Sequence, residues 1–195
     1  FFKDRVKEYV KSDMKNRDQL IEMIVDLHFF FQQMNLQLDL SLRDIQQLST
    51  EVNVFLKSEW TKEAVVGLAW NLYRGNFSQD EQEAFTYLIR EKFGVLVTQL
   101  DKTRRESVRQ SRGDVYAAKG FVLVDPAAEY VADIQDFLKM RQARFVNQSS
   151  LQGKRGMINE GPSALGKDEI VLEELKHAGF SEDSPDPTKR FYRMT

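Results

Sequence analysis

The fold class of this chain is decided by the stretch Leu20-Ile-Glu-Met-Ile-Val-Asp-Leu-His-Phe-Phe-Phe-Gln-Gln-Met34. Its apolar residues recur at spacings of three and four and leave little polar surface, which is typical of a helix buried on most sides. Glu22, Asp26 and His28 interrupt the apolar run, so it falls short of the about 18 apolar residues that a membrane-spanning helix requires. We therefore expect a central helix here, with His28 as a packed core residue.

Further helices are indicated on both sides of this stretch. An amphipathic helix is expected from Phe2, and the next is expected to begin at Ser41, whose hydroxyl can accept a hydrogen bond from a free backbone amide. A helix rich in Val and Leu follows and should end at Gly75. The sequence Ser78-Gln-Asp-Glu81 is a regular capping box, so it predicts another helix, which we expect to continue through the polar residues 101–112 and to end at Gly113.

The last core helix is expected after a short strand-like run, Phe121-Val-Leu-Val124, which is too short and too isolated to form a sheet. Asp125-Pro126 predicts the start of this helix, because proline is favoured in the first helical turn. The sequence thus predicts an all-α fold, with a bundle of five or six helices over residues 1–146.

The composition changes beyond Val146 to Asn, Gln, Ser, Gly and Pro. Closely spaced glycines and prolines disfavour regular structure, so residues 147–195 are predicted to form an extended, mostly irregular C-terminal arm. One short helix is expected within it, capped by Asp168 and closed at Gly179-Phe180 by a Schellman motif.

Catalytic and cofactor chemistry finds little support in the sequence. The chain has no cysteine, which excludes disulfides, thiolate catalysis and iron–sulfur clusters. The stretch from Gly161 to Lys167 resembles a phosphate-binding loop, but Asp168 stands where that motif requires Ser or Thr. Glu174 and His177 have the spacing of a di-iron ligand pair, but such a site needs a second copy that the chain lacks. We expect no catalytic residue, cofactor or metal.

The charged residues suggest how the chain could bind partners. The net charge is only −2, yet basic residues concentrate in 102–112, where Arg105, Arg109 and Arg112 share one helix face. This face could bind an acidic protein or an anionic membrane surface, or it could be an ordinary solvated helix end; nucleic acid is not expected. Aromatic and arginine side chains are common interface anchors, so we also predict partner binding by the C-terminal set Phe180, Arg190, Phe191, Tyr192 and Arg193.

The stretches Thr61-Lys-Glu-Ala64 and Asn71-Leu-Tyr-Arg-Gly-Asn-Phe-Ser-Gln-Asp-Glu81 resemble part of the tumour-necrosis-factor-induced protein 8-like family. The resemblance is local, and nothing after Lys92 follows that family's pattern. It implies a helical bundle with a lipid-binding cavity.

The sequence therefore favours a non-catalytic accessory subunit of a larger protein assembly, which binds other subunits through helix faces and the C-terminal arm. A helical lipid-binding regulatory protein is the alternative. We expect a soluble intracellular chain, either cytoplasmic or processed within an organelle. The first residue is Phe1 rather than methionine, which is consistent with a fragment, a processed chain or a sequence trimmed to its ordered part.

Overall fold

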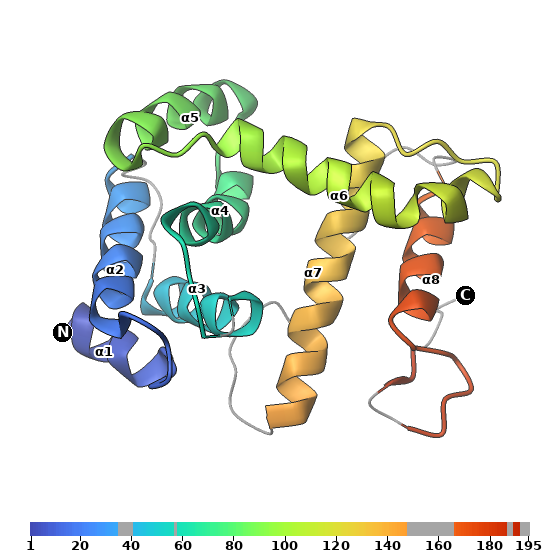
Figure 1. Cartoon of the computed structure of the whole chain (residues 1–195), viewed down its shortest axis with the longest axis horizontal. Helices are drawn as coiled ribbons and strands as arrows, with labels where there is room; N and C mark the ends of the chain where they lie inside the picture. The colour runs from blue at the N-terminus through green and yellow to red at the C-terminus, as the bar shows by residue number, and fades with distance from the viewer. Residues whose placement is uncertain (35–40, 57, 148–165, 187–188, 192–195) are drawn as a thin grey trace. The chain divides into compact units, whose positions relative to one another are not determined.

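The computed structural model describes residues 1–34, 41–56, 58–147, 166–186 and 189–191, and in these ranges the chain is all-α. The described residues form eight α-helices, one short 3-10 helix and a single isolated β-bridge between Ser181 and Arg190. Figure 1 labels the α-helices from α1 to α8. They group into two compact units, one ending at Asp101 and the other beginning at Lys102. The prediction of an all-α fold is confirmed.

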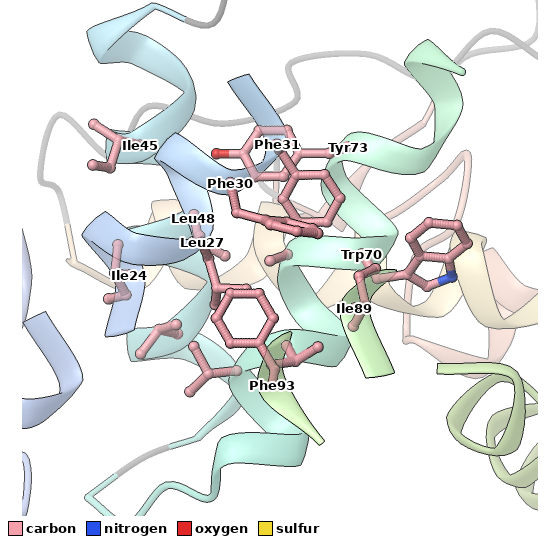
Figure 2. Close-up of a cluster of buried hydrophobic side chains, with 14 of the residues drawn as sticks. Ile24, Leu27, Phe30, Phe31, Ile45, Leu48, Trp70, Tyr73, Ile89 and Phe93 are labelled. Carbon is pink, nitrogen blue, oxygen red and sulfur yellow. The ribbon is translucent and has the colours of Figure 1, made fainter. Parts of the chain in front are cut away.

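The first unit is built around α2, the helix predicted to be central. Helix α2 (Arg17–Met34) packs against α1 (Phe2–Tyr9), α3 (Leu42–Phe55) and α4 (Lys62–Tyr73). Side chains from α2, α3, α4 and α5 (Gln79–Phe93) form one core, and Figure 2 labels ten of its members. They are Ile24, Leu27, Phe30, Phe31, Ile45, Leu48, Trp70, Tyr73, Ile89 and Phe93.

The starts of α3 and α5 follow the predicted capping residues. Ser41 and Asp44 form a capping box at α3, and Ser78 and Glu81 form one at α5. In the second, the Ser78 amide donates to Glu81 at 2.7 Å and the Glu81 amide donates to the Ser78 hydroxyl at 3.4 Å. Each cap satisfies backbone amides that a helix start leaves without partners, an effect of about 1 kcal/mol.

The helix predicted to run from residue 79 to residue 112 is in fact two helices. Gly94 adopts a left-handed conformation, with φ of 70°, and its amide closes α5 by donating to Arg90 at 2.8 Å. Helix α6 (Val97–Ala117) then begins after a short break and continues through Gly113, where the sequence predicted an end. A glycine ends a helix only where the chain takes up the left-handed conformation, and otherwise it is a tolerated helical residue.

The second unit comprises most of α6, the long helix α7 (Asp125–Asn147) and α8 (Lys167–His177). The predicted helix start at Asp125-Pro126 agrees with the start of α7. The unit has its own apolar core, to which α6 contributes Val108 and Tyr116, and α7 contributes Val131, Ile134 and Leu138.

The C-terminal helix belongs to this core. The sequence placed α8 in an extended arm over residues 147–195, whereas α8 packs against α7 and buries Ile170, and Phe180 joins the same cluster. The predicted boundary at residue 146 adjoins residues 148–165, which lie outside the described residues, so the division into 1–146 and 147–195 stays a prediction.

The C-terminal end of α8 agrees with the prediction from the sequence, and its N-terminal end does not. Asp168 lies in the first turn instead of capping the helix, because Gly166 occupies the N-cap position with φ of 66°. The Schellman motif is confirmed: the Phe180 amide donates to Leu175 at 2.9 Å and the Gly179 amide donates to Lys176 at 3.0 Å.

Candidate functional site

The basic segment 102–112 pairs with an acidic stripe on α7. Arg104 donates to Asp133 at 2.9 Å and to Asp136 at 2.6 Å. Arg105 lies 3.6 Å from Asp125 and 3.7 Å from Glu129. The arginines of this segment are thus held by carboxylates of their own unit.

Arg109 completes this pairing at the start of α7. Its guanidinium donates to Asp125, and its Nε donates to the carbonyl of Leu123 at 2.8 Å. The hydrogen bond from Arg109 holds the pKa of Asp125 below its usual value. The contact also fixes the loop between α6 and α7 through its backbone.

Arg112 points into the second unit and joins a buried polar cluster, which we call the Arg112–Glu174 network: Arg112, Tyr116, Gln135, Glu173 and Glu174. Arg112 is 5% exposed and Glu174 is 1% exposed. Glu174 accepts from Arg112 Nε at 2.9 Å, from the Tyr116 hydroxyl at 2.8 Å and from Gln135 Nε2 at 2.8 Å. Burial raises the pKa of Tyr116, and its hydrogen bond to Glu174 adds to the effect. The phenol therefore remains a donor, and the network ties α6, α7 and α8 together.

Glu173 forms the outer part of the network. Its carboxylate accepts a hydrogen bond from Arg112 Nη2 at 3.1 Å and another from the ammonium of Lys119. Hydrogen bonding to Lys119, with Arg112 adding to it, lowers the pKa of Glu173. Glu173 and Glu174 therefore each accept a hydrogen bond from at least one residue besides Arg112.

A pocket of about 270 Å³ lies beside this network within the second unit. Arg112 and Glu174 form part of its wall, Leu138 and Ala178 supply apolar surface, and its remaining lining residues are Ser111, Gln135, Lys139, Gln142 and His177. Gln142 also donates to the carbonyl of Ala178 at 3.1 Å, which helps to close the end of α8. Residues of α6, α7 and α8 thus contribute to the lining of the pocket.

The residues predicted to bind partners have intramolecular contacts wherever the structure describes them. The contacts of Arg105, Arg109 and Arg112 are described above. Phe180 is buried in the core of the second unit, and Phe191 packs against that core. Arg190 donates to the carbonyl of Ser184 at 2.9 Å. Tyr192 and Arg193 lie outside the described residues. Partner binding by this set stays a prediction.

Sequence reasoning missed the acidic side of these pairs. Asp125, Glu129, Asp133 and Asp136 recur at spacings of four and three, which puts them on one helix face. This acidic stripe was the feature of the sequence from which pairing with the basic segment 102–112 could have been predicted. The Arg112–Glu174 pair had no such local signal, because its members are 62 residues apart in the sequence.

His28 is fully buried, as predicted. Its Nδ1 lies 3.3 Å from the Tyr73 hydroxyl, while its Nε2 has no hydrogen-bond partner among the residues that the structure describes. Burial lowers the pKa of His28, an effect that the negative charge of Asp44 partly opposes. The imidazole is therefore stabilised in its neutral form.

The described residues contain neither a candidate metal site nor a candidate membrane-spanning helix. No group of three or more His, Asp or Glu side chains in the described part of the chain is arranged to hold a metal ion. Among the helices described, none combines the length and apolar character needed to cross a membrane.

Comparisons of the chain with protein families, with curated proteins and with solved structures give no match. The likeness to the tumour-necrosis-factor-induced protein 8-like family therefore stays a local resemblance, and the functional argument rests on the geometry of the chain itself.

Proposed function

We propose that this chain is a non-catalytic accessory subunit of a larger protein assembly, and that it contacts an apolar surface of another subunit through the loop between α6 and α7. The observation that carries this proposal is the exposure of two valines on a fixed loop: Val122 is 81% exposed and Val124 is 57% exposed.

Contacts with other residues of the second unit hold the loop between α6 and α7 in place. Leu123, between the two valines, is buried in the core, and its carbonyl accepts from Arg109. The amide of Phe121 donates to the carbonyl of Tyr116 at 2.9 Å. A loop fixed in this way loses little conformational freedom on binding, so its exposed valines can contribute to affinity at low entropic cost.

The environment of Glu174 is that of a structural residue rather than a catalytic one. Catalysis by a carboxylate requires lone pairs that can reach a substrate, whereas Glu174 is buried and accepts three hydrogen bonds from its own unit. This arrangement is suited to holding helices in place.

The proposal is tested by purifying the full-length chain with its partners from native cells and identifying them by mass spectrometry. We expect the V122D/V124D double variant to lose stoichiometric partners that the parent chain retains. Y87D is a matched control, because Tyr87 is another exposed apolar side chain, 60% accessible, on α5. Retention of every partner by V122D/V124D, with an unchanged melting temperature, would refute the proposal.

A truncation at Val146 is a poor test of the C-terminal residues. It would remove Ile170 and Phe180 from the core of the second unit, so loss of assembly could follow from unfolding alone. Substitution of Phe191, which packs on the edge of that core, is a milder test of whether the C-terminal residues contribute.

Lipid binding in a Phe-rich interior is the alternative from the sequence. In the first unit the aromatic rings pack on one another: the centroids of Phe31 and Tyr73 are 4.8 Å apart and those of Phe77 and Phe85 are 4.2 Å apart. Rings in mutual contact favour a filled core, so the accessory-subunit proposal has the better support.

A further inference from the structure

Aromatic rings surround the buried imidazole of His28 in the first unit. Its centroid lies 5.6 Å from the ring of Phe2 on α1 and 6.4 Å from the ring of Tyr73 on α4. On its own helix the neighbouring ring is Phe29, at 5.9 Å. Tyr73 is 1% exposed, whereas Phe2 is only partly buried and Phe29 is 37% exposed. The Phe2 side of the imidazole is therefore the side nearest to solvent, and α1 covers it.

The closed arrangement leaves one ring nitrogen of His28 unsatisfied. Nδ1 lies 3.3 Å from the Tyr73 hydroxyl, but Nε2 finds no hydrogen-bond partner in the described part of the chain. In either neutral tautomer, Nε2 is then a donor or an acceptor that has left water without compensation, which is unfavourable. Movement of α1 away from the ring would let water reach Nε2 and relieve this cost.

Protonation of His28 would make the closed arrangement less favourable still, because an imidazolium has two donors and a charge to satisfy. The groups around it supply little: α1 presents the apolar ring of Phe2, and α4 presents the neutral hydroxyl of Tyr73. From α3, the negative charge of Asp44 acts on the ring. That carboxylate, however, already accepts from the amide of Ser41 at 2.8 Å and from its hydroxyl at 2.9 Å. Burial outweighs Asp44, so the pKa of His28 is lowered in the closed form.

Helix α1 is held to the first unit by few buried side chains. Of its eight residues, Val6 is the one that is fully buried. Its ion pair to α2 joins Lys3 and Glu22, whose side chains are 49% and 58% exposed, and such pairs contribute little because solvent screens them. A helix this short depends on its packing for stability. It can therefore open locally while the rest of the unit stays folded.

We propose that α1 is an acid-sensitive lid over His28. A proton from solvent binds the unprotonated ring nitrogen, the contact between Phe2 and His28 opens, and the charged ring becomes hydrated. Opening also uncovers the surface of α2 around Phe29, because the Phe2 ring packs on Phe29 with centroids 5.2 Å apart. The first unit thus presents more aromatic surface in mildly acidic solution than at neutral pH.

The linkage between proton binding and opening sets the size of the effect. In the open form, the pKa of His28 is the ordinary value of about 6.5. With a closed form that binds no proton in this range, the equilibrium constant for opening increases about 30-fold between about pH 8 and about pH 5.

Hydrogen exchange, measured by NMR on the full-length chain, tests the lid. Each exchange rate is divided by the rate for an unstructured peptide at the same pH, so that only the opening equilibrium remains. Between about pH 8 and about pH 5, the protection of the amides from Arg5 to Val10 should fall about 30-fold. The amides of α5 belong to the same unit and should keep their protection. Equal losses in α1 and α5 would mean that His28 acts on global unfolding, which would overturn the proposal.

Two histidine variants assign the response to one ring. H28F cannot take up a proton, so the protection of α1 should no longer depend on pH. H177Q is the matched control, because His177 is the other histidine of the chain and lies exposed on α8. It should retain the full response. Persistence of the response in H28F, or its loss in H177Q, would contradict the assignment to His28.

Two adjacent phenylalanines test which side chain forms the cover. F2A should raise the pKa of His28, followed by its ring proton signals, toward the ordinary histidine value. F1A should leave it unchanged, because Phe1 is 75% exposed. Equal effects of F1A and F2A would show that Phe2 is not the cover. The parent chain and H28F decide the proposal even if F2A does not fold. Val122 and Val124 belong to the second unit, so failure here leaves the proposed function untouched.

Discussion

Replacing Arg112 by methionine would test whether the Arg112–Glu174 network holds the second unit together. The substitution keeps much of the buried volume but leaves Glu174, 1% exposed, without its charged partner. Tyr116 and Gln135 would still donate to it, but neither carries a positive charge. Removing one member of a buried ion pair typically costs 3 to 5 kcal/mol, and the two remaining donors place R112M at about 3 kcal/mol.

The assay is urea unfolding at neutral pH, followed by far-ultraviolet circular dichroism. Tryptophan fluorescence would be recorded in parallel, because Trp60 and Trp70 both belong to the first unit. A loss seen by circular dichroism and not by fluorescence would assign the effect to the second unit.

Two further variants make the test specific. R112M/E174Q removes both charges and keeps an amide oxygen that can accept from the Tyr116 hydroxyl, so it should be more stable than R112M, since no unpaired carboxylate remains buried. R109M breaks a pair whose side chains are 35% and 64% exposed, and it should be much milder than R112M because solvent screens the pair. If R112M were as mild as R109M, or if the double variant were less stable than R112M, the network would not have the role that we assign to it.

Two other predictions concern the first unit and α6. Because burial lowers the pKa of His28 in the folded chain, the unfolded chain binds more protons below the usual histidine pKa of about 6.5, so His28 should reduce the stability as pH falls through that value. H28L should flatten this part of the pH dependence in urea unfolding, and an unchanged slope would contradict the assignment. Gly94 and Gly113 form a matched pair: G94A should destabilise the chain by about 1 kcal/mol, because φ is 70° there, whereas G113A should stabilise it by about 0.5 to 1 kcal/mol as a helical alanine. Thermal melts of the two variants would distinguish these effects, and shifts of the same sign would show that the backbone argument is wrong.

Local features of the structure were predictable from the sequence. The apolar pattern of residues 20–34 predicted the central helix, and Ser78 with Glu81 predicted the start of α5, because both signals depend on residues a few positions apart. The Schellman motif at Gly179 was predictable for the same reason.

Features that depend on tertiary contacts were not predictable in this way. Gly94 and Gly113 look alike in the sequence, yet only Gly94 takes the left-handed conformation that ends a helix. The composition after Val146 suggested an arm, whereas Ile170 and Phe180 lie in the core of the second unit. The pocket requires α6, α7 and α8 together, so no single segment could reveal it.

The Arg112–Glu174 pair also limits which changes of length the second unit can tolerate. Each residue of an α-helix rotates the chain by about 100°, so one residue inserted in α8 before Glu174 would turn its carboxylate away from Arg112. The same insertion would turn Ile170 or its neighbours out of the core. Helix α8 is therefore fixed in register, and substitutions should accumulate on its exposed positions long before insertions or deletions do.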